Sequence, residues 1–168
     1  PPAMISQKMQ DALSEHASQE VYSAYLYLAM GAYCDTTAHK GFGRWLRVQH
    51  GEELEHARKI IDYVVARGGQ PTLAAVAAPP REFGALTQLF EAVLAHERRV
   101  TERIHALYAA AAAEKDAAAQ VFLQWFVGEQ VEEEAAVQEI VDKLRLVGDR
   151  PGAALYLDKE YGKRGKGG

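Results

Sequence analysis

The stretch that decides the fold is GEELEH at residues 51–56, which has a counterpart, GEQVEE, at residues 128–133, 77 positions further along the chain. The same offset places Glu20 in register with Glu97. Glu53 follows Glu20 by 33 residues, and Gln130 follows Glu97 by the same 33 residues. The sequence therefore predicts two copies of one structural unit.

Apolar residues recur at helical spacing along most of the chain, whereas the alternating β-branched runs that would indicate strands are missing. Glycine and proline gather in a few places and mark the ends of the helical segments. We predict an all-α fold in a single domain, 1–168. Its four-helix bundle spans about 6–147, with helices at about 6–34 and 38–67, a third that starts after Pro79-Pro80 and runs to about 113, and a fourth at about 116–147. A short fifth helix at about 153–161 precedes a flexible tail at 162–168.

The lengths of the connections restrict the topology of this bundle. A few residues join the first helix to the second and the third to the fourth, so each pair is predicted to be an antiparallel hairpin. By contrast, 15 residues, 68–82, join the second helix to the third. Fully extended, they would span roughly 50 Å, whereas a helix of about 28 residues is ~42 Å long. This long crossover can therefore run the length of the bundle and set those two helices parallel.

Six polar residues of the repeat are predicted to point into the bundle, because residues seven apart lie on nearly the same face of a helix. Glu53 shares its stripe with Leu46 and Ile60, and Glu133 shares its stripe with Phe126 and Ile140. The other four members of the set are Glu20, His56, Glu97 and Gln130. Four carboxylates, an imidazole and an amide are thus expected near the middle of the bundle.

These buried carboxylates need a positive counterpart. Isolated buried carboxylates cost several kcal/mol each, and neighbouring ones repel each other. Lysine and arginine are missing from the polar stripes at this level, and two divalent cations would neutralise four carboxylates. Oxygen ligands with one imidazole suit iron(II), manganese(II) or zinc. The pattern therefore predicts a site for two metal ions.

Nearly the whole chain, from about residue 4 to 161, resembles the non-haem bacterial ferritins of the ferritin-like di-iron superfamily. The resemblance rests on EVYS at 20–23, GEELEH at 51–56, HE at 96–97, FLQWF at 122–126 and EQVEE at 129–133. It implies a ferroxidase that oxidises iron(II) with oxygen or peroxide and stores the ferric mineral inside a hollow homo-oligomer of 24 subunits. The short fifth helix would then lie at the fourfold axis of the shell.

The resemblance also implies roles for individual residues. The first iron would bind to Glu20, Glu53 and His56, Glu53 would bridge the two metals, and the second iron would bind to Glu97 and Glu133 with Gln130 nearby. A third, weaker iron position would involve Glu52, Glu129 and Glu132, and Tyr27 would lie beside the centre. Haem is not expected, because Leu54 stands where the haem-containing bacterioferritins carry their haem-ligating methionine.

Composition narrows the range of partners. The 19 Lys+Arg and 23 Asp+Glu give a net charge of −4, which argues against nucleic acid or an anionic membrane as a partner. Cys34 is the only cysteine, so neither an intrachain disulfide nor a cysteine-based metal site can form. No apolar run approaches the ~18 residues of a membrane span, and residues 1–10 lack the pattern of a signal peptide. We therefore expect a cytoplasmic protein.

Other interpretations stay open. Glu52 and Glu132 lie on mixed stripes and fit a solvated acidic face as well as a metal position, and Tyr27 and Trp125 fit core packing as well as a redox role. The remaining histidines, His16, His39, His50, His96 and His105, are expected to be ordinary structural or surface residues. Two further function classes remain: a rubrerythrin-like di-metal oxidase or peroxidase acting on peroxide or an organic substrate, and a bundle whose metal is structural.

Overall fold

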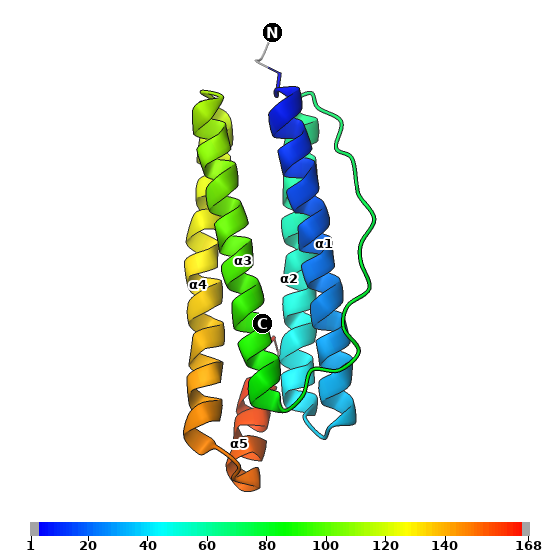
Figure 1. Ribbon diagram of the computed structural model, residues 1–168, viewed down its shortest axis with the longest axis vertical. Coiled ribbons are helices and arrows are strands. Elements are labelled where there is room, and N and C mark those ends of the chain that lie inside the picture. Colours follow the sequence, from blue (N-terminus) through cyan, green and yellow to red (C-terminus); the bar gives the residue numbers. More distant parts are fainter. Residues whose placement is uncertain (1–3, 166–168) are drawn as a thin grey trace. The chain divides into compact units, whose positions relative to one another are not determined.

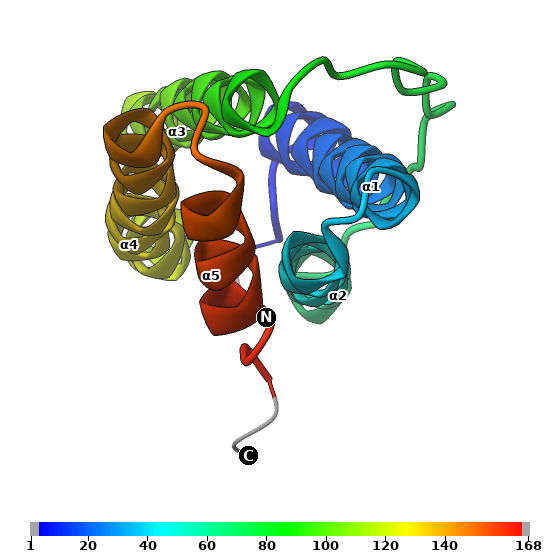
Figure 2. The same ribbon diagram turned by 90° about the horizontal axis from the view of Figure 1, so that it is seen from below.

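A computed structural model of the chain describes residues 4–165. They form five helices, which can be followed in Figure 1 and from below in Figure 2: α1 (Gln7–Thr36), α2 (Lys40–Ala66), α3 (Leu86–Ala113), α4 (Ala117–Val147) and α5 (Pro151–Tyr161). The predicted segments agree with these helices to within two residues at each end, except at the start of α3. Helix α3 begins later than expected, after Gly84 at φ 73°, and α5 begins two residues early because proline at the first helical position has a suitable φ.

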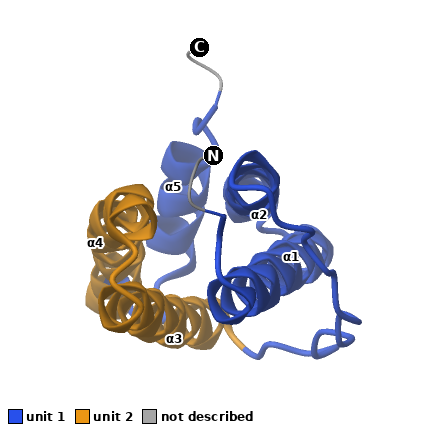
Figure 3. Cartoon of the chain, turned by 90° about the horizontal axis from the view of Figure 1, so that it is seen from above, with its two compact units in different colours: residues 1–84, 147–168 blue, residues 85–146 orange. Residues whose placement is uncertain are grey.

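The chain divides into two compact units, coloured in Figure 3. Among the described residues, unit 1 comprises 4–84 and 147–165 and contains α1, α2, the crossover and α5. Unit 2 comprises residues 85–146 and contains α3 and α4. Each unit is built around one antiparallel helical hairpin, as the short connections predict. Within residues 4–165, no helix combines the length and apolar character needed to cross a membrane.

The α1–α2 hairpin packs closely near its turn. The backbone N–H groups of Thr37 and His39 both donate to the Cys34 carbonyl, at 3.2 and 2.9 Å, and close the turn between the helices. A Cβ atom at Gly43 would lie 2.9 Å from the carbonyl oxygen of Gly31 on the facing helix. Because real Cβ atoms do not approach so closely, the glycines permit the separation of α1 and α2 seen here.

The long crossover runs along α1 and is fastened to it (Figure 1). The backbone N–H groups of residues 70, 72 and 74 donate to side chains on α1, namely Gln10 at 2.9 Å, Ser14 at 3.1 Å and Ser18 at 2.9 Å. Two residues of extended chain advance about 6.6 Å and four residues of helix advance about 6.0 Å, so the two repeats stay in register. At its far end, the Tyr33 hydroxyl donates to the Gly84 carbonyl at 2.8 Å.

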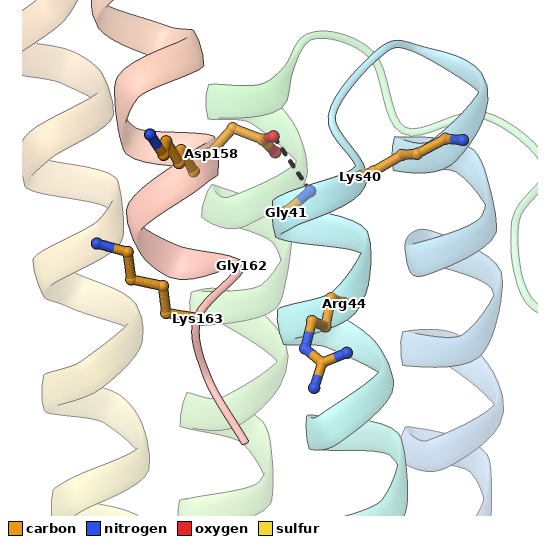
Figure 4. A pocket seen from close by; sticks show the side chains of 7 residues that line it. Lys40, Gly41, Arg44, Asp158, Gly162 and Lys163 are labelled. Carbon is orange, nitrogen blue, oxygen red and sulfur yellow. Dashed lines mark hydrogen bonds between the residues drawn. The ribbon is translucent and has the colours of Figure 1, made fainter. Parts of the chain in front are cut away.

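Helix α5 docks on the start of α2. The Asp158 carboxylate accepts a hydrogen bond from the Gly41 N–H at 3.1 Å (Figure 4). It also accepts one from the Phe42 N–H at 2.8 Å, and thereby caps α2 from more than 100 residues away. The N-cap residue of α2, His39, makes no such side-chain bond itself. Tyr161 stacks on Phe42 with ring centroids 5.5 Å apart. An acidic side chain at a helix N-terminus also interacts favourably with the helix dipole.

The segment after α5 makes specific contacts, which differs from the flexible tail expected for 162–168. Residues 162–165 form turns, and Arg164 donates to Glu52 Oε2 at 2.9 Å and to the Trp45 carbonyl at 3.3 Å. Its guanidinium lies 4.4 Å from the centre of the Trp45 ring. Residues 166–168 of the predicted tail lie outside the described residues.

Unit 2 is held together by its apolar core and by polar contacts between α3 and α4. Asp116, directly before α4, accepts a hydrogen bond from the Ala119 N–H at 3.0 Å. Arg145 on α4 donates two hydrogen bonds to Glu91 on α3, at 3.0 and 3.1 Å. These contacts fix the register in which α3 presents its polar positions to α4.

Candidate metal centre

Unit 1 gathers two carboxylates and an imidazole. Glu20 comes from α1, and Glu53 and His56 come from α2, where their i, i+3 spacing puts them on one helical face. One ligand atom of each residue lies within 4.8 Å of those of the other two. The three side chains are buried, with exposed fractions of 1%, 2% and 5%. This combination of oxygen and nitrogen donors suits a divalent transition-metal ion.

Hydrogen bonds orient the two carboxylates of this cluster. Glu53 accepts from Gln49 Nε2 on Oε1 at 3.1 Å, and its Oε2 lies 3.0 Å from His56 Nδ1. Glu20 Oε1 lies 2.9 Å from His16 Nε2. The other oxygen of Glu20, Oε2, lies 3.6 Å from His56 Nδ1 and has no hydrogen-bond partner.

Opposite charges stabilise each other within the cluster. Burial by itself would raise the pKa of Glu20, but favourable interactions with its neighbours Glu53, His16 and His56 outweigh the effect of burial and hold that pKa well below its ordinary value. Burial would likewise lower the pKa of His56, but the neighbouring carboxylates of Glu20 and Glu53 raise it to about 11. Without metal, a proton on His56 therefore supplies positive charge to the cluster, and a metal bound there has to replace it.

Unit 2 gathers the matching polar residues of the second half. Glu97 on α3 and Gln130 and Glu133 on α4 are buried, with exposed fractions of 1%, 3% and 7%. Gln130 Nε2 lies 3.1 Å from Glu97 Oε2, 3.2 Å from the Glu97 carbonyl and 3.1 Å from Thr101 Oγ1. The amide of Gln130 thus ties down the Glu97 side chain, and the unit offers only oxygen ligands from its carboxylates.

Known proteins share this sequence pattern and fold. Residues 10–147 match the ferritin-like domain. The chain is 42% identical over 161 residues to the bacterial non-heme ferritin of Bacteroides fragilis, which covers 96% of this chain and 100% of that protein. The bacterial non-heme ferritin of Staphylococcus saprophyticus is 38% identical, with 96% of each chain covered. The chain belongs to the ferritin family.

Solved ferritins confirm the predicted fold class. The open pore ferritin from the hyperthermophilic archaeon Archaeoglobus fulgidus superposes with a TM-score of 0.95 at 52% sequence identity, over 96% of this chain and 99% of that one. A humanized archaeal ferritin superposes with a TM-score of 0.94 at 50% identity. The all-α, ferritin-like four-helix bundle with a long crossover and a short fifth helix is therefore confirmed, as is the resemblance to the non-haem bacterial ferritins.

The remaining predicted site residues lie outside these buried groups or beside them. Tyr27, seven residues after Glu20 on α1, is completely buried. Glu52 is half-buried and forms an ion pair with Arg164. Glu129 is half-buried and Glu132 is exposed. The ferritin fold thus keeps the three acidic residues of the predicted third position nearer the surface than the ligands beside them in sequence.

Sequence reasoning missed two residues of the unit 1 site. His16 and Gln49 each lie four residues before a predicted ligand, Glu20 and Glu53 respectively, and each bonds to that carboxylate. Since residues at i and i+4 are neighbours on a helix, this spacing was a usable signal. From the sequence, His16 is placed among the ordinary histidines, because it belongs to none of the ligand motifs.

Proposed function

We propose that this ferritin-family protein oxidises iron(II) to iron(III) at an intrasubunit di-iron centre and stores the ferric product within a hollow homo-oligomeric shell. The observation that carries the proposal is the buried cluster of Glu20, Glu53 and His56. Membership of the ferritin family supports iron as the metal, and unit 1 gathers the three residues to which the family resemblance assigns the first iron.

The complete centre would use both units. We propose that Glu97 and Glu133, with Gln130 nearby, hold a second iron beside the first and that Glu53 bridges the two. The 77-residue repeat supports this arrangement, because equivalent positions of the two hairpins carry these ligands. Charge supports it as well: with His56 neutral, the two carboxylates of each unit would balance one divalent cation.

The chemistry needs little from the protein beyond binding. Each iron(II) gives up one electron, so two ions supply the pair that reduces oxygen to peroxide or peroxide to water. The carboxylates favour iron(III) over iron(II) because it carries more positive charge. Tyr27 would lie beside the centre, and Glu52, Glu129 and Glu132 would provide the third, weaker position through which iron passes onward. Binding of iron at Glu52 would have to compete with Arg164.

Storage requires an enclosed volume, which a single chain of 18.5 kDa does not provide. Leu155 and Tyr156 on α5 are exposed, with fractions of 53% and 64%, and would be covered by a neighbouring subunit in a closed assembly. We propose the 24-subunit shell implied by the family resemblance, in the cytoplasm, without haem and without nucleic acid or membrane as a partner. A solution mass near that of one chain would count heavily against storage.

Aerobic iron loading tests the proposed function. The proposal predicts that the wild-type protein, mixed with many equivalents of iron(II), oxidises them rapidly and retains ferric iron far above two ions per subunit. A Leu54→Ala variant, altered beside Glu53 without removing a ligand, is the control and should retain iron similarly. Turnover of an organic substrate or peroxide at a fixed two metals per subunit would instead select a rubrerythrin-like enzyme. Unfolding of the protein on chelation alone would select a structural metal.

A further inference from the structure

We propose that His16 is a positioning residue of the metal centre: it holds one oxygen of Glu20 so that the other oxygen is presented to the first metal. This inference rests on the function proposed for the Glu20, Glu53 and His56 cluster. It assigns a role to a histidine that the ligand pattern itself does not include.

The contact between His16 and Glu20 is short and buried. His16 Nε2 lies 2.9 Å from Glu20 Oε1, and the two residues have exposed fractions of 4% and 1%. They are four residues apart on α1, so they lie one turn apart on the same face of the helix. An ionised carboxylate can only accept hydrogen bonds, so the hydrogen is on Nε2 of His16, which donates it.

The second oxygen of Glu20 is left open toward the cluster. Glu20 Oε2 is buried without a hydrogen-bond partner and lies 3.6 Å from His56 Nδ1. Leaving a buried charged atom without a hydrogen-bond donor is costly, so the position favours an arriving cation. Glu53 differs, because its Oε1 accepts from Gln49 and its Oε2 lies beside His56. Glu20 therefore keeps one ligand atom available at a fixed position, so an arriving cation breaks no bond to reach it.

The second half of the repeat shows that packing alone does not require a histidine here. The residue 77 positions after His16 is Val93, which is completely buried on α3. Its side chain cannot donate a hydrogen bond to Glu97. In unit 2, Gln130 makes that bond from α4 instead. The carboxylate of unit 1 is thus anchored within its own helix, and the carboxylate of unit 2 is anchored from the facing helix.

Removing a hydrogen bond that orients a metal ligand typically lowers the affinity for the metal about 10–100-fold. Without His16, Glu20 would be free to rotate or to bind the metal with both oxygens. We expect first-site affinity to fall and the coordination geometry to change. A replacement that still donates a hydrogen bond to Oε1 should preserve both.

Cobalt(II) is a suitable probe, because its visible spectrum reports its coordination geometry and it does not consume oxygen at the site. We would titrate the metal-free full-length protein with cobalt(II) and compare wild type with His16→Leu and His16→Gln. The account predicts at least about tenfold weaker first-site binding and an altered spectrum for His16→Leu. His16→Gln keeps an N–H donor and should bind within about threefold of wild type, with the wild-type spectrum.

Three controls make the result decisive. His50→Leu removes a half-buried histidine that bonds to the Ala24 carbonyl at 2.7 Å and is not a proposed ligand, and this variant should bind cobalt(II) like wild type. Glu53→Ala should lose the tight site; if it binds as tightly as wild type, the proposed centre itself is wrong. Circular dichroism checks the fold, and if His16→Leu does not fold, His16→Asn, which retains an amide but is too short to reach Glu20, takes its place.

Two outcomes would overturn the role of His16 while leaving the centre intact. Wild-type affinity and spectrum in His16→Leu would show that the hydrogen bond positions nothing. Equal losses in His16→Leu and His16→Gln would show that the imidazole itself is required, as for a direct metal ligand. Weak binding in His16→Leu with rescue in His16→Gln is the result that the positioning role requires.

Discussion

The two hairpins follow one sequence pattern but prepare their carboxylates differently. In unit 1, α1 and α2 bring together two carboxylates and an imidazole, and one oxygen of Glu20 is left without a partner. In unit 2, Gln130 takes the place of Glu53 in the repeat and is hydrogen-bonded to Glu97. Gln130 thus holds Glu97 within unit 2, whereas one carboxylate oxygen of unit 1 stays without a hydrogen-bond donor.

This difference predicts an order of metal binding. Nitrogen and oxygen ligands together hold iron(II) better than oxygen ligands alone, and a bond between Gln130 and Glu97 has to be weakened before Glu97 can bind fully. We therefore infer that the first iron binds to unit 1 tightly and that the second is held more weakly. A weakly held iron suits a substrate in transit rather than a permanent cofactor.

The largest effect is expected for Glu53→Ala, because this residue belongs to the unit 1 cluster and is proposed to bridge both metals. The fast phase of iron(II) oxidation should disappear in stopped-flow measurements. The fold should persist, which circular dichroism checks. Unchanged oxidation kinetics in this variant would refute the site.

Glu133→Ala should separate binding of the first iron from binding of the second. It removes a carboxylate of unit 2 and leaves the unit 1 cluster complete, so anaerobic iron(II) binding should fall from about two ions per subunit to about one. The affinity of the remaining ion should match the tighter site of the wild-type protein. Loss of both ions would mean that the units do not bind metal independently.

Gln130→Glu should reduce the difference in iron affinity between the two hairpins. The change replaces an amide that donates to Glu97 with a carboxylate, so it should raise affinity for the second iron. The first turnover should be little affected, but the centre should regenerate more slowly between additions of iron. If variant and wild type regenerate equally fast, or if wild-type centres stay filled with iron(III) while mineral grows, the transit account is wrong.

The pH dependence of stability should also differ between the clusters, because only that of unit 1 contains a histidine. The pKa of His56 is raised from 6.5 to about 11 in the folded metal-free protein. Its stabilising effect is therefore complete below about pH 6.5 and is lost as the pH rises toward 11. Thermal unfolding of the metal-free protein should show a decline from pH 7 to 9.5. His56→Gln should flatten this decline, and an equal slope in both proteins would contradict the assignment.

The smallest effect concerns the crossover, which only unit 1 carries. Ser14→Ala and Ser18→Ala each remove an acceptor for a crossover N–H and should each lower the free energy of unfolding by about 1 kcal/mol. Urea denaturation measures this loss, with the exposed Gln7→Ala as a control on the same helix. Metal binding should not change, and a loss of iron oxidation in either variant would mean that the crossover shapes the centre.

Much of the fold follows from local patterns in the sequence. Apolar periodicity predicts the four long helices, and the length of the crossover predicts that it can run along a helix. Its anchors were not predicted, because Ser14 and Ser18 sit inside a helix and their partners are backbone groups 58 and 56 residues away. The cap of α2 by Asp158 was missed for the same reason, since a contact across 117 residues leaves no local signal.

For the candidate site, too, the sequence predicts one part, the ligands, and does not predict another, the residues that hydrogen-bond to those ligands. The apolar stripes predict that Glu20, Glu53 and His56 are buried, and the structure gathers them within one unit. The partners of the ligands, His16 and Gln49, were not predicted because nothing in the stripe argument separates an outer hydrogen bond from ordinary packing. The contacts of Arg164 were hidden by the composition of the segment around it, which is rich in glycine and lysine.

An anomalous-scattering map at the iron edge, from crystals prepared with stepwise additions of iron(II) under anaerobic conditions, tests the central claim most directly. The account predicts one peak among Glu20, Glu53 and His56 at low iron, followed by a second peak among Glu53, Glu97 and Glu133 as more iron is added. Glu53 would contact both. The account would be contradicted if the peak between Glu97 and Glu133 appeared first, or if the two peaks shared no ligand.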